Sequence, residues 1–276
     1  MKEDLYDDLL NEKEEKTDFQ ALFFKYIIHW PWFVASVLIC TGLAFAYLRY
    51  QIPVYEVSSS ILIKEDDKKS TNNALSAMQD FGMLSMTSNF DNELEILKSR
   101  TLIKKVVSRL NLYTNIAIEQ SFGYDVPLYK NSPLDVFMTA EEADKLEGNI
   151  RLELIYSPTG QLTVTAFYIQ NGDKQETTKS FDELPAILPL PVGVITISHN
   201  DSSPAPQEPV NLKAIISTPT AVAAGYRAGL TVAPISNTST IATISVQNTH
   251  IQRASDFTQE LIILYNQDTN TEKNEV

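Results

Sequence analysis

Residues 30–64 read WPWFVASVLICTGLAFAYLRYQIPVYEVSSSILIK, an apolar run that passes directly into an alternating one. No Asp, Glu, Lys or Arg occurs between Lys25 and Arg49. At a rise of about 1.5 Å per residue, a helix of this length crosses the roughly 30 Å hydrocarbon core of a bilayer. Tryptophans at its start and tyrosines at its end match the aromatic belts at the two headgroup levels, and Pro31 suits a first helical turn. The run predicts a transmembrane helix over residues 30–50.

Two alternatives to a membrane span fit the sequence less well. A buried core helix seldom needs so long an uncharged run. A cleaved signal peptide would have a small-residue site at Ala44-Phe45-Ala46, but acid-rich residues precede the run where a signal peptide has a short basic segment. The orientation stays open, because few Lys and Arg residues flank the span on either side.

Residues 1–29 are expected to be a tail followed by an interfacial helix. Residues 2–16 combine acids with apolar residues at helical spacing, which suits a short docking helix or, more simply, a solvated tail. From Phe19 to Ile28 apolar residues recur at helical intervals, as in a helix that lies on the membrane ahead of the span.

The region after the span begins with a strand and a helix. Val54 to Lys64 predicts a strand by its β-branched and aromatic content, and a polar segment with turn character follows at 65–73. A helix is expected from about Asp91 to Leu110, with one apolar face made by Leu94, Leu97, Ile103, Val106, Val107 and Leu110.

Residues 132–217 predict a β-rich stretch. Alternating apolar residues flank a turn at Ser157–Gly160, which indicates a hairpin, and Asn171-Gly172 offers a second tight turn. The Pro-rich run Leu184–Val192 is expected to break regular structure. Further strands are expected at 194–198 and 210–217.

The last part of the chain returns to helices and strands. Thr218 followed by Pro219 predicts a helix start, since Pro in the first turn loses no hydrogen bond, and this helix should end near Gly229. Strands are expected at 230–233 and 241–247. A last helix has Ser255 as its expected cap and an apolar stripe made by Phe257, Leu261, Leu264 and Tyr265.

Composition excludes several kinds of partner and site. The formal net charge of -13 over 276 residues argues against nucleic acid, because the field of the protein repels phosphates. The single cysteine, Cys40, lies in the apolar run, so one chain can build neither a disulfide framework nor a Cys-based zinc site.

The sequence predicts no catalytic, cofactor-binding or metal-binding residues. None of the nine glycines stands in phosphate-loop spacing. The acidic cluster Glu65-Asp66-Asp67 lacks the spaced carboxylates of a calcium loop. No metal-binding pattern includes any of the histidines, which are His29, His199 and His250.

Basic residues mark the polar side of the helix expected at 91–110. They are Lys98, Arg100, Lys104, Lys105 and Arg109. This side suits the acidic surface of a neighbouring subunit or a polyanionic glycan, and a solvated helix face is the simpler interpretation. The candidate subunit contacts are Lys98, Arg100 and Lys105.

Two sets of short motifs resemble a known family. Close after the span come Pro53-Val54-Tyr55-Glu56-Val57 and Ile61-Leu62-Ile63, then Glu95-Ile96-Leu97-Lys98-Ser99-Arg100 leading into Val106-Val107 and Leu110. The late set comprises Ser239 to Ser245, Arg253 to Phe257, and Leu261-Ile262 to Tyr265-Asn266. In this order the chain resembles the chain-length determinant family, also called Wzz-type polysaccharide co-polymerases, over about residues 20–112 and 218–270. The family-motif residues are Pro53, Tyr55, Glu56, Leu97, Lys98, Ser99 and Arg100.

The resemblance implies an inner-membrane protein with a cytoplasmic N-terminus and a periplasmic α/β domain. Such proteins assemble into homo-oligomeric rings and set how long a surface polysaccharide grows, as O-antigen, capsule or exopolysaccharide. They act on the polymerase or export machinery and make or break no bond themselves. Relatives from capsule and exopolysaccharide systems add a cytoplasmic tyrosine kinase after a second span.

The expected fold is therefore α+β, with one transmembrane helix and a periplasmic mixed α/β domain over 51–112 and 218–276. Two features depart from the family pattern. The sequence stops at Val276, ahead of the long helix, proline-rich segment and second span, and it carries a β-rich insertion over 113–217. The alternative function is an extracytoplasmic ligand-sensing domain of a membrane signalling protein. A hydrolase would need a clustered catalytic constellation that the sequence does not offer.

Overall fold

The computed structural model describes residues 30–50, 53–63, 82–120, 124–204, 206–236 and 239–274. The tail and interfacial helix expected in 1–29 and the polar segment at 65–73, with its acidic cluster, lie outside these residues. The chain divides into two compact units, Met1–Pro53 and Val54–Val276, and each is described by itself.

The described part of the first unit is one long apolar helix, α3 (Trp30–Tyr50). Its stretch Trp30–Leu48 is long and apolar enough to cross a membrane, and none of its side chains is buried. A helix that is apolar all round needs an apolar surrounding, either a protein core or lipid. The helix expected at 30–50 is present, with the same bounds.

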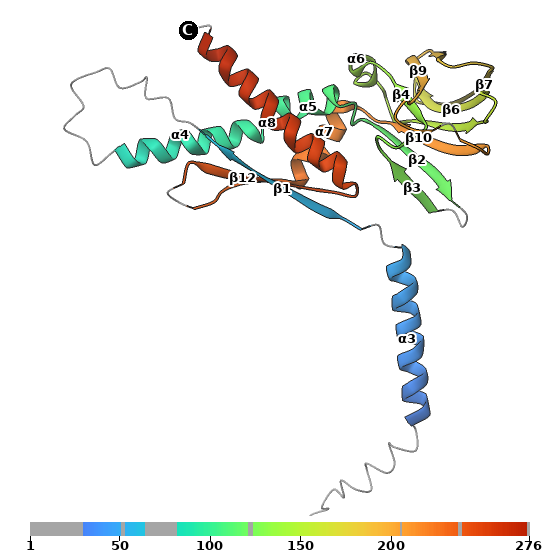
Figure 1. Ribbon diagram of the computed structural model, residues 1–276, viewed down its shortest axis with the longest axis horizontal. Helices are drawn as coiled ribbons and strands as arrows, with labels where there is room; N and C mark the ends of the chain where they lie inside the picture. The colour runs from blue at the N-terminus through green and yellow to red at the C-terminus, as the bar shows by residue number, and fades with distance from the viewer. Residues whose placement is uncertain are drawn as a thin grey trace, which may run out of the picture. The chain divides into compact units, whose positions relative to one another are not determined.

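The second unit combines helices with antiparallel sheets (Figure 1). Its helices are α4 (Gly82–Leu97), α5 (Arg100–Arg109), α6 (Ala140–Ala143), α7 (Pro219–Gly229) and α8 (Ile251–Asn274). Its strands are β1 (Tyr55–Leu62), β2 (Thr114–Gln120), β3 (Tyr124–Leu128), β4 (Leu134–Phe137), β5 (Ile150–Tyr156), β6 (Leu162–Gln170), β7 (Asp173–Phe181), β8 (Ala186–Leu190), β9 (Gly193–His199), β10 (Val210–Ile216), β11 (Leu230–Pro234) and β12 (Ile241–Asn248). The mixed α+β class expected from the sequence is confirmed.

One layer pairs strands from the two ends of the unit. β1 and β11 flank β12 in an antiparallel sheet, with Ser59 opposite Ile244 and Ile61 opposite Ala242. Helix α8 packs along β1 and β12, and α5 packs against both α7 and α8. The alternation of β12 turns Ala242, Ile244 and Val246 into the core.

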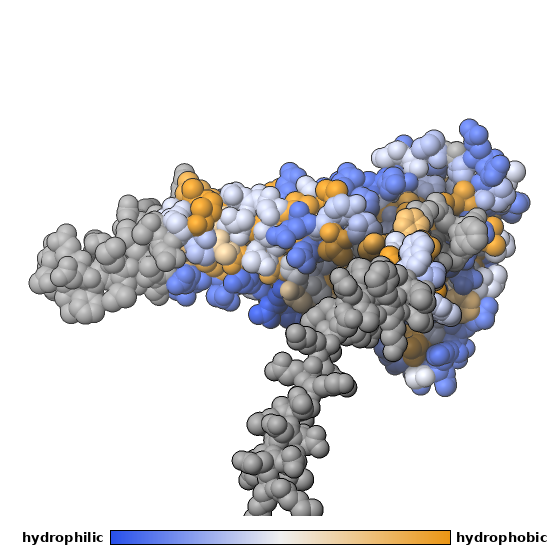
Figure 2. All heavy atoms as spheres, turned by 90° about the horizontal axis from the view of Figure 1, so that it is seen from below, coloured by the Kyte–Doolittle hydropathy of each residue, from blue (hydrophilic) through white to orange (hydrophobic). Residues whose placement is uncertain are grey.

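The other face of this sheet carries small hydroxyl side chains. Ser58 and Ser245 lie opposite each other, and their hydroxyl oxygens are 2.8 Å apart. Thr231 lies on the far side of Ser245 in the same row. Figure 2 shows hydrophilic and apolar residues interspersed over one side of the unit, not gathered in a single apolar patch.

Two further sheets contain the described strands between α5 and α7. The order is β3-β2-β10-β5-β6-β7 in a six-stranded sheet and β4-β9-β8 in a three-stranded one. The predicted hairpin turns are present: Gly160 has φ +89° after β5, and Asn171 and Gly172 have φ +54° and +83° between β6 and β7. Two successive positive φ values match the type I′ turn that Asn-Gly favours. The insertion expected at 113–217 stays a prediction, because the contacts make Val54–Val276 one compact unit.

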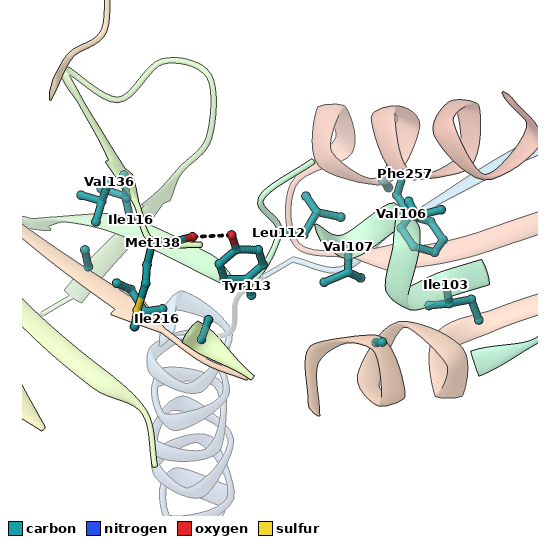
Figure 3. Close-up of a cluster of buried hydrophobic side chains, with 14 of the residues drawn as sticks. Ile103, Val106, Val107, Leu112, Tyr113, Ile116, Val136, Met138, Ile216 and Phe257 are labelled. Carbon is teal, nitrogen blue, oxygen red and sulfur yellow. Dashed lines mark hydrogen bonds between the residues drawn. The ribbon is translucent and has the colours of Figure 1, made fainter. Parts of the chain in front are cut away.

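One hydrophobic core cluster includes residues from all three sheets and from the helices, and Figure 3 shows part of it. Leu112 and Tyr113, both fully buried, follow α5 and lead into β2. The Tyr113 hydroxyl donates a 2.6 Å hydrogen bond to the Met138 carbonyl next to β4, and burial raises the pKa of Tyr113. This hydroxyl satisfies a carbonyl of the core while the ring is buried in the core cluster.

The single helix expected from Asp91 to Leu110 is wrong. Ser99 has φ -64° and ψ 139°, which are extended values, and its side chain accepts a hydrogen bond from the Leu102 amide. A serine in this geometry is the N-cap of a new helix. The apolar face expected for one helix is thus divided between α4, which ends at Leu97, and α5, which begins at Arg100.

Two further expectations are corrected by the structure. The run Leu184–Val192 does not break regular structure, because β8 (Ala186–Leu190) pairs with β9 and includes Pro189. β8 is an edge strand, where a missing amide hydrogen is tolerated. Ser255 does not cap the last helix, since α8 already begins at Ile251.

Candidate functional site

The family-motif residues 97–100 form the turn between α4 and α5. Leu97 is fully buried and Ser99 caps α5, so these two positions fix the turn. Lys98 lies 3.3 Å from Glu95 in an ion pair within one helical turn, and Arg100 is exposed at the start of α5. Arg100 therefore presents positive charge at the surface of this turn, whereas Lys98 is partly exposed and pairs with Glu95 of the same chain.

The other family-motif residues lie at the beginning of β1. Pro53 and Glu56 are exposed, and Tyr55 is 41% exposed. In the sheet register Tyr55 is opposite Asn248, at the end of β12 that leads into α8. No polar contact ties Tyr55 or Glu56 to another side chain among the residues described, so their predicted motif role stays a prediction.

The basic side of α5 meets acidic residues of the same chain. Lys105 lies 2.8 Å from Asp268 on α8, and Arg109 lies 3.0 Å from Glu260 on the same helix. Lys104 pairs with Asp144 just after α6. The sequence identified the basic residues but not these partners, which are far away in the chain.

Asp144 links three elements through both carboxylate oxygens. One oxygen accepts from Lys104 on α5, and the other accepts a 3.1 Å hydrogen bond from the amide of Thr220 in the first turn of α7. Burial alone would raise the pKa of Asp144, but the hydrogen bonds from Lys104 and Thr220 together lower it. The lowered pKa stabilises the fold at neutral pH, and this contribution is lost as the pH falls through the folded-state pKa.

Sequence reasoning placed Arg253, at the start of α8, in a motif of the resemblance but did not identify it as a buried site residue. Arg253 is only 8% exposed. Its guanidinium donates to the Leu112 carbonyl, the Asn115 side-chain oxygen and, at 3.1 Å, the Tyr226 hydroxyl. Arg253 thereby joins α8 to the α5–β2 connection, to β2 and to α7. An arginine next to the expected apolar stripe was the available signal.

Aromatic and charged residues surround Arg253. Lys130 lies 2.6 Å from Asp256, and the Tyr129 ring meets the His250 ring edge-on with centroids 5.6 Å apart. Burial and the neighbouring Asp256 carboxylate hold the pKa of Tyr129 well above its usual range. Tyr129 therefore stays neutral.

A pocket of about 200 Å³ opens beside Arg253. Its lining comes from β2, β3, α7, the β12–α8 connection and α8, and it includes Asn115, Leu128, Tyr226, His250 and Arg253. No group of three or more metal-ligating side chains lies together among the described residues, here or elsewhere.

Comparison with known proteins relates the N-terminal part of this chain to one family. Residues 15–110 match the family model Wzz, chain length determinant protein. The match covers α3, β1, α4 and α5 and ends at the connection that leads to β2. It confirms the resemblance seen in the sequence for these residues. A search of curated proteins found no match to the chain.

Proposed function

We propose that this protein is a membrane-anchored regulator that sets the chain length of a surface polysaccharide and supports its export. The observation that carries the proposal is the Wzz match over residues 15–110, which includes the apolar helix α3 and the first strand and helices of the α/β unit. The Wzz family regulates chain length without enzymatic activity. The role proposed for this chain is therefore that of a scaffold, not a catalyst.

The proposed location is the bacterial inner membrane. Helix α3 would span the bilayer once in this chain, with the N-terminal tail in the cytoplasm and the second unit in the periplasm. Further copies of the chain and the polymerase or export machinery are the proposed partners. O-antigen, capsule and exopolysaccharide remain the candidate polymers.

Cysteine labelling is expected to place the second unit outside the cytoplasm. Cys40 is first replaced with alanine, and single cysteines are introduced at Thr17 and at Glu176, which is exposed on β7. In spheroplasts, a membrane-impermeant maleimide should label the cysteine at position 176 and should reach position 17 only after lysis. The reverse pattern would overturn the proposed orientation.

Reversing the charges of the three candidate subunit contacts is expected to change the length distribution of the polysaccharide. The variant replaces Lys98, Arg100 and Lys105 with Glu in the full chain, expressed in cells that lack the native copy. Exposed charge changes usually alter the free energy of unfolding by under about 0.5 kcal/mol each, so the fold should persist. Gel electrophoresis of the polysaccharide should show a different modal length than the wild type gives.

Two controls separate a subunit contact from an intramolecular effect. Reversing Lys145, Lys174 and Lys179, which are exposed elsewhere, should leave the length distribution unchanged. The charge swap Lys105→Glu with Asp268→Lys restores the pair within the chain. The swap is compared with Lys105→Glu alone. If both change the polysaccharide length, an intermolecular role for Lys105 is supported. If Lys105→Glu changes the length and the swap restores it, the effect comes from the pair within the chain and that role is excluded. Equal distributions in cells with and without the protein would overturn the proposed function itself.

A further inference from the structure

We propose that the pocket beside Arg253, at the N-terminus of α8, binds an oxyanion: a carboxylate or phosphate group carried by a small solute or a sugar. This inference goes beyond the proposed function and does not depend on it. It rests on a buried positive charge, the donors around it and the pocket onto which they open.

The guanidinium of Arg253 is nine-tenths buried and has neutral hydrogen-bond partners. They are a carbonyl, an amide oxygen and a phenol. Among the described residues, no carboxylate lies within ion-pair distance of Arg253, and the nearby carboxylate of Asp256 pairs with Lys130. Burying a charge without an opposite charge is costly, so this arrangement favours a negative ligand.

Arg253 also has donors left for such a ligand. A guanidinium carries five N–H groups, and the three contacts use one each on Nε, Nη1 and Nη2. One N–H on each terminal nitrogen therefore remains. Two terminal N–H groups of an arginine suit the oxygens of a carboxylate or phosphate, and charge-assisted bonds of this kind are the strong ones.

The surroundings of the pocket favour negative charge as well. Thr249 and His250, which immediately precede α8, line it, and a 24-residue helix presents the positive end of its dipole there. Nδ1 of His250 is buried and has no hydrogen-bond partner in the described part of the chain. A volume of about 200 Å³ exceeds several times the roughly 30 Å³ share of one water, so an oxyanion group fits.

The overall charge of the protein argues against diffuse binding of anions. At a formal net charge of -13, the surface as a whole repels anions. Saturable anion binding therefore has to come from a local cluster such as Arg253 with the first turn of α8. The carboxylate of Asp256, which lies in these surroundings, is 2.6 Å from Lys130, and no ion pair joins it to Arg253 in the described part of the chain.

The test is isothermal titration calorimetry on the full chain in a neutral detergent. The probes are inorganic phosphate and glucuronate, with glucose as the uncharged comparison and chloride holding the ionic strength constant. Saturable binding of phosphate or glucuronate, without binding of glucose, is the expected result. Tighter binding of glucuronate indicates an acidic sugar as the source of the group, and tighter binding of phosphate indicates a phosphate group.

Substitutions locate the site. Arg253→Met removes the charge and is expected to weaken binding by about tenfold or more, since it removes charge-assisted hydrogen bonds. Arg227→Met removes the same charge from an exposed position on α7 and should leave the affinity unchanged. Equal losses in both variants, or no saturable binding by the wild type, would overturn the proposal.

A third variant decides the matter if Arg253→Met does not fold, as judged by circular dichroism. His250→Leu keeps the arginine contacts and changes only the half-buried side chain at the pocket wall. It should weaken anion binding severalfold, and an unchanged affinity overturns the proposal. None of these measurements involves polysaccharide length, so their failure is distinct from a failure of the proposed function.

Discussion

Replacing Phe257 with alanine is expected to lower the free energy of unfolding by about 3–5 kcal/mol, the range for removing a fully buried aromatic side chain. Phe257 is fully buried on α8, and its ring stacks on Tyr226 of α7 with centroids 4.4 Å apart. Figure 3 shows it beside Val106 of α5. The truncation would therefore leave a cavity where α5, α7 and α8 meet.

Chemical denaturation of the full chain in detergent, followed by the circular dichroism of its folded unit, measures this effect. The matched control is Phe137→Ala on β4, because it removes the same atoms from a side chain that is 50% exposed. The control should cost about 1 kcal/mol or less, since surface substitutions have small effects. Similar losses in the two variants would mean that Phe257 is not a central part of the core.

The elements that local sequence predicted well are those whose geometry depends on neighbouring residues. Asn171-Gly172 adopts the two positive φ values of a tight hairpin turn. Thr218 caps α7 by accepting from the Ala221 amide, with Pro219 in the first turn. In both places the side chain and the backbone conformation belong to the same few residues, so the sequence alone decides the structure.

Elsewhere a local signal was outweighed by a neighbouring one. The apolar residues on both sides of Ser99 continue at helical spacing, but the cap of that serine starts a new helix. Pro189 suggested a break, yet its place on the edge strand β8 lets it remain in the sheet. Whether a strand lies at the edge or in the centre is a property of the assembled sheet, and a proline in the sequence does not reveal it.

The candidate sites depended on contacts between distant parts of the chain. Lys105 is identifiable as exposed and basic from its helix, but its pairing with Asp268 joins residues separated by 163 positions. Arg253 lies in a motif of the resemblance, and only the fold brings it to Leu112, Asn115 and Tyr226. Sequence periodicity indicates which face of an element is buried, not which residue of another element it meets.

Placing lysines in the middle of α3 is expected to prevent stable membrane insertion. Each lysine at the centre of a spanning helix costs about 3 kcal/mol in transfer free energy, and each replaced leucine also loses its own favourable contribution. The double variant Leu38→Lys with Leu43→Lys therefore costs about 6 kcal/mol or more. Both side chains are 67% exposed on α3, so no protein core compensates for this cost. Fractionation with carbonate extraction should find the variant outside the membrane or degraded, whereas the wild type stays in the membrane pellet.

The matched control moves the same two charges toward the helix ends, as Val34→Lys with Leu48→Lys. Lysine near a helix end can extend its ammonium group to the headgroup region, so this variant should still be extracted only by detergent. Each variant carries two added lysines and the same net charge, so the depth of the lysines in the bilayer is the main difference between the two variants. If both stay in the membrane pellet, α3 is not the anchor, because a spanning helix cannot be indifferent to charge at its centre. If both variants are lost from the membrane pellet, the lysines act on expression or folding. A membrane span requires the two variants to differ, and this result would show no difference between them. A loss confined to the central pair is the result that a membrane span predicts.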